Sequence, residues 1–455
     1  MIQRIDYLSR LAKWREKQAV KVISGIRGCG KTTLLALYIN WLKRSGVEDR
    51  QIIFIDMEEP ENEPLLHYQK LYTHVKKYLC NDKLTYVFLD EIQKCKNYES
   101  VIDGLVKNQA DVYIAVSNDY NASRTPHVEI KMLPLSFAEC LIFSKVRAKS
   151  PQTGGKAGEL KTPPVNMPPQ IYKAYATDRR LPRQKAQMEQ FLRREAFNHY
   201  VSFGGFPFTA ALGDDAGFIR QCADGIYNTV LVKNAAQQKG INDIPLLEDI
   251  AKRMSHCIGH PLSSKKISAS IAAGGKKIST NTVEMYMRAL TAAFVFYHAG
   301  RFDIKAGKRL KTLGKYYVAD TGIRNLLLET RPSADSAFPV ESALPSESAI
   351  KGQLENIVCM ELMRRGLRVC TGKYGGDEVS FVAFVSGSDG GDRIYVQVIT
   401  SARDAATLAR ALSPLERIRD NHPKYILSLD ETPFRASRNG IIQKNLVDWL
   451  VEKAN

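Results

Sequence analysis

Residues 25–32 read Gly25-Ile26-Arg27-Gly28-Cys29-Gly30-Lys31-Thr32 and match the pattern G-x-x-x-x-G-K-[ST] at every defined position. The apolar run Val20–Ser24 before them is typical of a buried strand, and Thr32–Lys43 after them has the apolar spacing of a helix. Glycines let backbone N–H groups curve around phosphate oxygens, and the following helix directs its positive end toward them. The stretch therefore predicts a phosphate-binding loop between a strand and a helix.

We expect this loop to bind ATP together with Mg²⁺. Lys31 would reach the β- and γ-phosphates, and the Thr32 hydroxyl would ligate the metal. Arg27 either touches phosphate or points away from it. The full set of nucleotide-contacting residues predicted by the pattern is Gly25, Arg27, Gly28, Cys29, Gly30, Lys31, Thr32 and Thr33.

Three further strand-like runs follow, at Gln51–Asp56, Leu84–Asp90 and Asp111–Val116. They alternate with helix-like segments over residues 1–143. Such alternation predicts an α/β domain in which helices cover both faces of a parallel sheet.

An acidic pair, Asp90 and Glu91, ends the second of these three runs. Beside a phosphate loop, Asp90 would hold Mg²⁺ through its water shell, and Glu91 would polarise the attacking water as a general base. The alternative is an acidic helix cap after a strand. The neighbouring Gln93 either orients water or faces solvent.

The run 111–116 is followed by Ser117 and Asn118. A polar residue at this end of a parallel strand can hydrogen-bond the γ-phosphate or the attacking water, and we assign that catalytic role to Asn118. A simple turn is the alternative. Arg124 is either a charge-stabilising arginine or an ordinary surface residue.

The whole chain has 455 residues with 65 basic and 48 acidic side chains, which gives a net charge of +17. This excess favours polyanionic partners such as duplex DNA or other nucleic acid, nucleotides or acidic membrane surfaces, and the alternative is a basic protein whose charge only keeps it soluble. No apolar run is long enough to span a membrane, and the first residues lack the apolar core of a secretion signal, so we predict a cytoplasmic protein. The eight cysteines are scattered without metal-binding spacing and are expected to be reduced thiols.

The remaining chain is divided by composition. Residues 144–183, rich in Pro, Gly and Lys, predict a flexible basic insertion that is either passive or contacts a polyanion. A helical domain is expected over 184–255, a winged-helix-like domain over 256–330, a linker over 331–349 and a third α/β domain over 350–455.

The winged-helix prediction rests on two helix-like segments, Lys265–Ala273 and Thr282–Tyr297, joined by a Gly- and Lys-rich turn. Strand-like residues follow at Ala293–His298 and Lys315–Val318. The residues expected on or beside the recognition helix are Thr280, Asn281, Thr282, Met285, Tyr286 and Arg288, with Lys276 and Lys277 in the turn before it. Such a domain either contacts DNA or serves only for packing.

Several short runs resemble a prokaryotic AAA-type ATPase family that carries a C-terminal domain of unknown function. The resemblance extends over nearly the whole chain. Its most specific elements are Leu133–Phe137, which reads Leu-Pro-Leu-Ser-Phe, and Gly204–Pro207, which reads Gly-Gly-Phe-Pro. Further matches are 25–32, 88–93, 315–317, 320–322, 352–356, 395–398 and 440–441.

The resemblance implies an ATPase core, a helical and winged-helix middle and a C-terminal domain similar to restriction-endonuclease-like folds. It also implies that rings or other oligomers can form. Thr125-Pro126 stands where relatives have Gly-Arg, so hydrolysis would be slow or would need a protein partner.

A nuclease of the restriction-endonuclease-like fold needs carboxylates around Mg²⁺ and a lysine near the attacking water. Glu355 and Glu378 match such positions, whereas Ser380, Gln397 and Ile399 replace the remaining acids and the lysine. We therefore predict a C-terminal domain without catalytic activity.

Together these features predict an Mg²⁺-dependent ATP-binding protein and ATPase that controls its winged-helix and nuclease-like domains. One alternative is a DNA-binding regulator that uses ATP as a structural ligand. A weaker alternative is an Mg²⁺-dependent nuclease.

Overall fold

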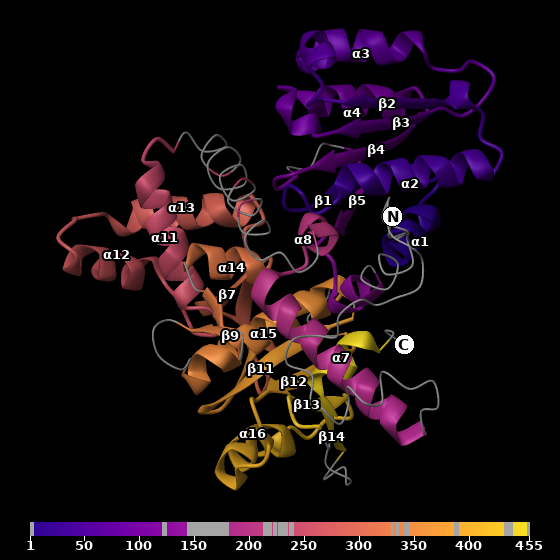
Figure 1. Cartoon of the computed structure of the whole chain (residues 1–455). Helices are drawn as coiled ribbons and strands as arrows, with labels where there is room; N and C mark the ends of the chain where they lie inside the picture. Colours follow the sequence, from indigo (N-terminus) through magenta and orange to yellow (C-terminus); the bar gives the residue numbers. More distant parts are fainter. Residues whose placement is uncertain are drawn as a thin grey trace. The chain divides into compact units, whose positions relative to one another are not determined.

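The computed structural model describes residues 4–120, 125–142, 182–212, 221, 225, 235, 241–328, 331–333, 336–340, 346–385, 391–431 and 440–452. The chain divides into two compact units (Figure 1). The first contains Met1–Pro134, Asp224–Arg253 and Ser264–Tyr297, and the second contains Leu135–Ala223, Met254–Ser263 and His298–Asn455. The predicted insertion 144–183 lies outside the described residues except for its last two positions.

The first unit is built on a five-stranded sheet in the order β2-β3-β4-β1-β5. All neighbouring pairs are parallel, which confirms the predicted fold class of this part of the chain. The strands are β1 (Val20–Ser24), β2 (Ile52–Asp56), β3 (Tyr86–Asp90), β4 (Asp111–Val116) and β5 (His127–Lys131).

Helices cover both faces of this sheet (Figure 1). On one face, α3 (Tyr68–Lys77) and α4 (Tyr98–Lys107) bury apolar residues at helical spacing, such as Leu71 and Val75, against the strands. On the other face, Tyr38 of α2 (Lys31–Arg44) packs on rings from β3 and β4. The helix α1 (Ile5–Lys13) precedes β1.

The same unit contains α12 (Ser264–Ala273), α13 (Thr280–Ala292) and most of α11 (Ile244–His256). The predicted helix Thr282–Tyr297 is wrong at its C-terminal end, because α13 stops at Ala292. Phe294 adopts a left-handed conformation (φ 58°) that breaks the helical hydrogen-bond pattern, and β6 then begins at Phe296.

The second unit is built on a seven-stranded sheet in the order β14-β13-β12-β11-β10-β6-β7. The strands β10, β11 and β12 are antiparallel neighbours, whereas β12, β13 and β14 run parallel. The strand bounds are β6 (Phe296–Asp303), β7 (Lys308–Val318), β10 (Arg368–Tyr374), β11 (Asp377–Phe384), β12 (Arg393–Val398), β13 (Lys424–Ser428) and β14 (Ile441–Asn445).

The strands β6 and β7 extend this sheet beyond β10, with β6 parallel to β10. They were expected to complete a winged helix with α12 and α13. The winged-helix arrangement stays a prediction. A two-stranded sheet, β8 (Arg331–Ser333) with β9 (Ser336–Val340), falls within the predicted linker 331–349.

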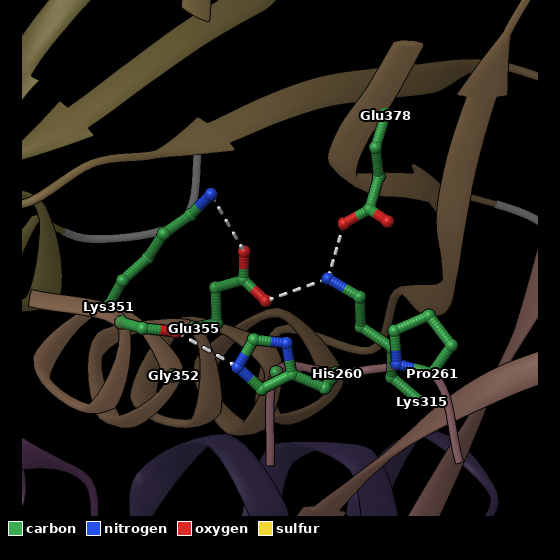
Figure 2. A pocket seen from close by; sticks show the side chains of 9 residues that line it. His260, Pro261, Lys315, Lys351, Gly352, Glu355 and Glu378 are labelled. Atoms are coloured by element: carbon green, nitrogen blue, oxygen red, sulfur yellow. Dashed lines mark hydrogen bonds and ion pairs between the residues drawn. The ribbon is translucent and has the colours of Figure 1, made fainter. Parts of the chain in front are cut away.

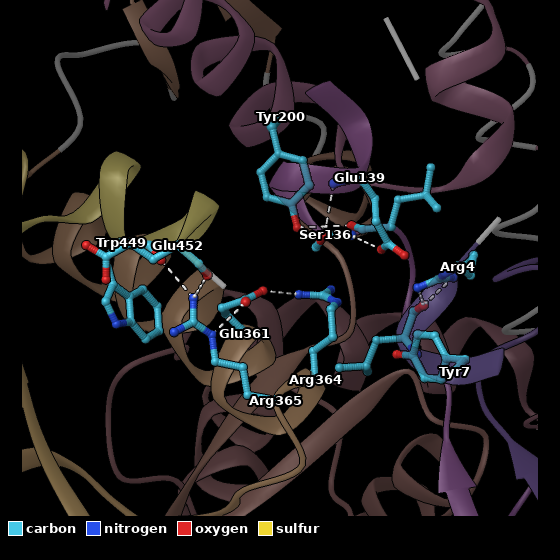
Figure 3. A network of polar contacts seen from close by, with 12 residues as sticks. Arg4, Tyr7, Ser136, Glu139, Tyr200, Glu361, Arg364, Arg365, Trp449 and Glu452 are labelled. Carbon is cyan, nitrogen blue, oxygen red and sulfur yellow. Dashed lines mark hydrogen bonds and ion pairs between the residues drawn. The ribbon is translucent and has the colours of Figure 1, made fainter. Parts of the chain in front are cut away.

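The helices of the second unit are α7 (Pro182–Phe203), α8 (Pro207–Leu212), α14 (Thr321–Leu327), α15 (Glu347–Arg364), α16 (Ala405–Arg417) and α17 (Leu446–Val451). The central helix α15 is buried continuously from residue 352 to residue 362. At its end, Arg365 donates hydrogen bonds to the carbonyl oxygens of Trp449 (2.7 Å) and Glu452 (3.3 Å), which anchors α17 (Figure 3).

The Gly-Gly-Phe-Pro motif has a structural explanation. The carboxylate of Asp320 accepts hydrogen bonds from the backbone N–H groups of Gly205 (2.6 Å) and Gly322 (2.8 Å). A Cβ atom at Gly204 would lie 1.9 Å from that carboxylate, and the Gly204 backbone has a positive φ of 77°. Only glycine fits there.

Candidate nucleotide-binding site

The glycine loop lies between β1 and α2, as its sequence predicts. Gly28 and Gly30 have φ values of 83° and 102°, which side-chain-bearing residues rarely adopt. At Gly25 a Cβ atom would lie 2.1 Å from the Met132 carbonyl oxygen. The loop therefore needs glycine for its backbone shape and for close packing.

Lys31 is the first residue of α2, and only 4% of it is exposed. Its ammonium group donates to the Gly25 carbonyl oxygen (3.1 Å) and to Ser117 Oγ (2.7 Å), and it lies 3.2 Å from Glu91 Oε1. Burial opposes the charge of Lys31, but the Glu91 carboxylate outweighs burial and raises the lysine pKa. Lys31 is thus a protonated, buried cation.

Glu91 completes this charged cluster from the end of β3. Its Oε1 accepts a hydrogen bond from Ser117 (2.6 Å), and its Oε2 accepts one from Gln93. Burial acts to raise the Glu91 pKa, but the Lys31 charge and the two hydrogen bonds lower it below its ordinary value. The carboxylate is therefore ionised and paired with Lys31.

Asp90 is fully buried beside this pair. Its Oδ1 accepts the backbone N–H of Glu91 (3.0 Å), whereas its Oδ2 has no hydrogen-bond partner among the described residues. Burial raises the Asp90 pKa to about 6, and the charges of Glu91 and Asp56 add to the shift. The Thr32 hydroxyl and the Lys31 charge oppose it. An unpartnered carboxylate oxygen close to a threonine hydroxyl suits a hard cation such as Mg²⁺.

The other predicted site residues lie as follows. Thr32 and Thr33 are exposed at the start of α2. Arg27 pairs with Glu58 (2.8 Å) in the present arrangement. Asn118 Oδ1 is buried and has no hydrogen-bond partner in the described part of the chain. Arg124 lies outside the described residues.

Sequence reasoning missed Arg4. Its guanidinium group, labelled in Figure 3, donates hydrogen bonds to the carbonyl oxygens of Cys29 (3.2 Å) and Leu133 (3.1 Å), and the first of these bonds anchors the glycine loop. No local pattern marks a single arginine near the N-terminus for this role. Asp56 was also unassigned, although an acid at the end of the strand next to β3 was a usable signal.

Most of the predicted DNA-contacting residues of α13 are exposed, among them Thr280, Asn281 and Met285. Tyr286 is buried, Arg288 forms an ion pair with Glu284, and Lys276 in the preceding turn forms an ion pair with Asp243 (2.9 Å).

Among the described residues, no group of three or more metal-binding side chains is present, and no helix has the length and apolar character needed to cross a membrane.

A parallel sheet whose strand β1 leads into this loop, and whose strand β3 ends at Asp90 and is followed by Glu91, has the architecture of a P-loop domain. Accordingly, residues 17–141 match the family model of an AAA domain. Residues 194–334 match a second model, described as a domain of unknown function (DUF8612). The suspected relation to AAA-type ATPases is confirmed for the N-terminal part of the chain.

Similar proteins occur in bacteria and archaea. An uncharacterised protein of Haemophilus influenzae is 26% identical over 461 residues, which cover 99% of both chains. An uncharacterised protein of Methanocaldococcus jannaschii is 25% identical over 76% of this chain and 67% of its own. The Walker-type ATPase of Pyrococcus abyssi aligns with 72% of this chain and 96% of its own at 13% identity, with a TM-score of 0.43.

Proposed function

We propose that the protein binds ATP with Mg²⁺ and hydrolyses the bond between its β- and γ-phosphates. The observation that carries this proposal is the buried cluster of Lys31, Glu91 and Ser117 at the mouth of the glycine loop. A lysine and a glutamate kept charged out of solvent are costly unless they have a function or very good pairing. Here they lie where a triphosphate would meet both of them.

Nucleotide binding would change the partner of the Lys31 ammonium group from Glu91 to a phosphate. A γ-phosphate carries more negative charge than Glu91 and would draw the Lys31 ammonium away from the carboxylate. Glu91 would then be free to accept a proton from a water molecule that attacks the γ-phosphorus. Its contact with Ser117 can hold the carboxylate in position during that step. Asn118, with its unpartnered oxygen, is available to orient the water.

The residues near the loop fit a magnesium ion. Asp90 and Thr32 would hold it, Asp90 through its Oδ2 atom, which has no partner among the described residues, and Thr32 through its hydroxyl. When bound, Mg²⁺ supplies positive charge that offsets the charge developing on the phosphate oxygens. Asp56, which pairs in register with Asp90, adds negative charge beside the same position.

A direct contact links this site to the helices of the first unit. The backbone N–H of Asp119, next to Asn118, donates a hydrogen bond to the Ala292 carbonyl oxygen at the end of α13 (3.0 Å). A shift of Asn118 toward a γ-phosphate would therefore act on α13. We propose this contact as the route by which ATP controls the predicted winged-helix and nuclease-like parts of the chain.

The proposal is tested by calorimetric titration with Mg·ATP and by phosphate release from purified full-length protein, with and without duplex DNA. Saturable binding and measurable turnover are expected. Binding without turnover under either condition would favour ATP as a structural ligand. Absence of saturable binding would refute the proposal.

Acid conditions should weaken Mg·ATP binding through Asp90. Because its pKa lies at about 6 in the nucleotide-free protein, the carboxylate loses its charge as the pH falls through that value. Lowering the pH from about 7.5 to 5.5 should reduce the contribution of Asp90 to affinity by roughly fourfold. Calorimetry on Asp90→Asn provides the control, since ATP itself also titrates. An identical pH profile in this variant would contradict the assignment.

A further inference from the structure

The second unit contains a cavity of about 160 Å³ at one end of β7 and β11, beside α15 (Figure 2). Charged and polar side chains line it, among them Lys315, Lys351, Glu355, Glu378, His260 and Ser348. Two runs that carry the family resemblance, 315–317 and 352–356, meet at this cavity although they are far apart in the chain. The nucleotide site does not use any of these residues.

Lys315 lies between the two glutamates. Its ammonium group contacts Glu355 Oε2 at 3.2 Å and also donates to Glu378 Oε1 (Figure 2). The lysine side chain is 4% exposed and that of Glu355 is 2% exposed, whereas Glu378 is 41% exposed. Burial opposes the lysine charge, but the two carboxylates outweigh it and raise the Lys315 pKa, so the ammonium group is retained.

The oxygen atoms of Glu355 are also engaged by other donors. Oε2 accepts the Tyr317 hydroxyl at 3.0 Å, and Oε1 accepts the Ser380 hydroxyl at 2.9 Å. The neighbouring amide of Gln397 is occupied as well, because its Oε1 atom accepts the Ser380 backbone N–H (2.9 Å). At the rim, His260 Nε2 is hydrogen-bonded to Ser348 (3.0 Å). Donors therefore already surround the acid that would be the central metal ligand.

The resemblance to restriction-endonuclease-like folds implies a divalent cation held by acids at this place. The element order agrees, since α15 is followed by β10, β11 and β12 and then by α16 and β13. The residues do not fit the metal. A magnesium ion needs several oxygen ligands in near-octahedral geometry, and here two carboxylates share an ammonium group instead.

We infer that Lys315 is a built-in cation that occupies the place of a divalent metal ion between Glu355 and Glu378. An ammonium group attached to the same chain offsets one of the two carboxylate charges, with no dependence on metal concentration. A metal ion could enter only by displacing a buried lysine, which would leave that charge without a partner. The second unit thus keeps the acids of a metal site but excludes the metal.

The inference is tested by removing the ammonium group. Lys315→Met keeps a long side chain but leaves two carboxylates facing the cavity, so it should create a divalent-cation site. All variants carry Asp90→Asn to weaken metal binding at the nucleotide loop. Mn²⁺ binding is measured by electron paramagnetic resonance, and we expect affinity at least about tenfold tighter than with Lys315 present. Saturating Mn²⁺ should also raise the melting temperature of this variant by about 5 °C.

Two controls make the result specific. Lys351→Met removes a half-exposed lysine of the same cavity that lies 4.0 Å from Glu355, and it should create no Mn²⁺ site. Lys315→Met combined with Glu355→Gln removes an acid and should abolish the gained binding. Equal Mn²⁺ affinity with and without Lys315 would overturn the inference.

A second measurement needs only protein with Lys315 intact, so it remains decisive if Lys315→Met fails to fold. Saturable Mn²⁺ binding that Glu355→Gln abolishes, or Mn²⁺-dependent nicking of plasmid DNA that the same change abolishes, would refute the built-in cation. No such binding or nicking is expected. The outcome is independent of the proposed ATPase, because no step involves the nucleotide site.

Discussion

Lys31→Ala should weaken Mg·ATP binding by about 100-fold or more, because the ammonium group would make charge-assisted hydrogen bonds to two phosphates. The substitution also leaves Glu91 buried without its counter-charge. Removing one partner of a buried ion pair costs about 3–5 kcal/mol, so the free energy of unfolding should fall as well. Calorimetric titration measures the first effect and thermal unfolding the second.

Loss of binding must be separated from loss of folding. Lys31→Met combined with Glu91→Gln removes both charges and should recover much of the stability, but it should not recover ATP affinity. Lys43→Ala is the matched control on the same helix, since Lys43 is exposed and its ion pair with Asp49 lies on the surface. If Lys31→Ala binds Mg·ATP as tightly as the parent protein, the loop does not hold the nucleotide as described.

Glu91→Gln should preserve nucleotide binding but impair turnover, whereas Lys31→Ala should impair binding itself. Nucleotide binding is expected to persist or to become tighter. In this variant no carboxylate at position 91 competes with the phosphates for the Lys31 ammonium group. Turnover should fall by roughly 100-fold or more, the usual contribution of a general base. Phosphate release under saturating Mg·ATP measures this loss, and calorimetry on the same sample measures affinity.

The exposed neighbour Glu59 provides the control for this experiment. Glu59→Gln alters the same net charge close to β2 but should leave turnover unchanged. Turnover of Glu91→Gln equal to that of the parent would show that another group activates the water. A joint loss of binding and turnover would instead indicate that Glu91 only shapes the loop.

Much of the first unit could be predicted because its signals are local. The strands β1, β3 and β4 are mostly apolar and buried along their whole length, which is what burial on both faces of a parallel sheet favours. The strand β5 escaped prediction for the converse reason. It lies at the sheet edge, and of its five residues only Ile130 is buried. Its polar composition does not differ from that of a loop.

The choice between Ser117 and Asn118 also needed the folded chain. Both follow β4, and either could face the nucleotide from sequence alone. In the structure Ser117 contacts both Lys31 and Glu91, whereas the side-chain oxygen of Asn118 has no hydrogen-bond partner among the residues that the structure describes. Successive residues of an extended chain point in different directions, so strand register and the position of β3 assign the contacts.

Two of the buried lysines, Lys31 and Lys315, show which contacts a single sequence can predict and which depend on the tertiary structure. The role of Lys31 in phosphate binding can be predicted from eight consecutive residues. The curvature of the backbone, the start of the helix and the phosphate contact all depend on immediate neighbours in the sequence. Lys315 meets Glu355, which lies 40 positions further along, and Glu378, which lies 63 positions further along. Those pairings arise from the packing of β7 and β11 around α15, and ionic contacts between distant segments leave no periodic trace in a single chain.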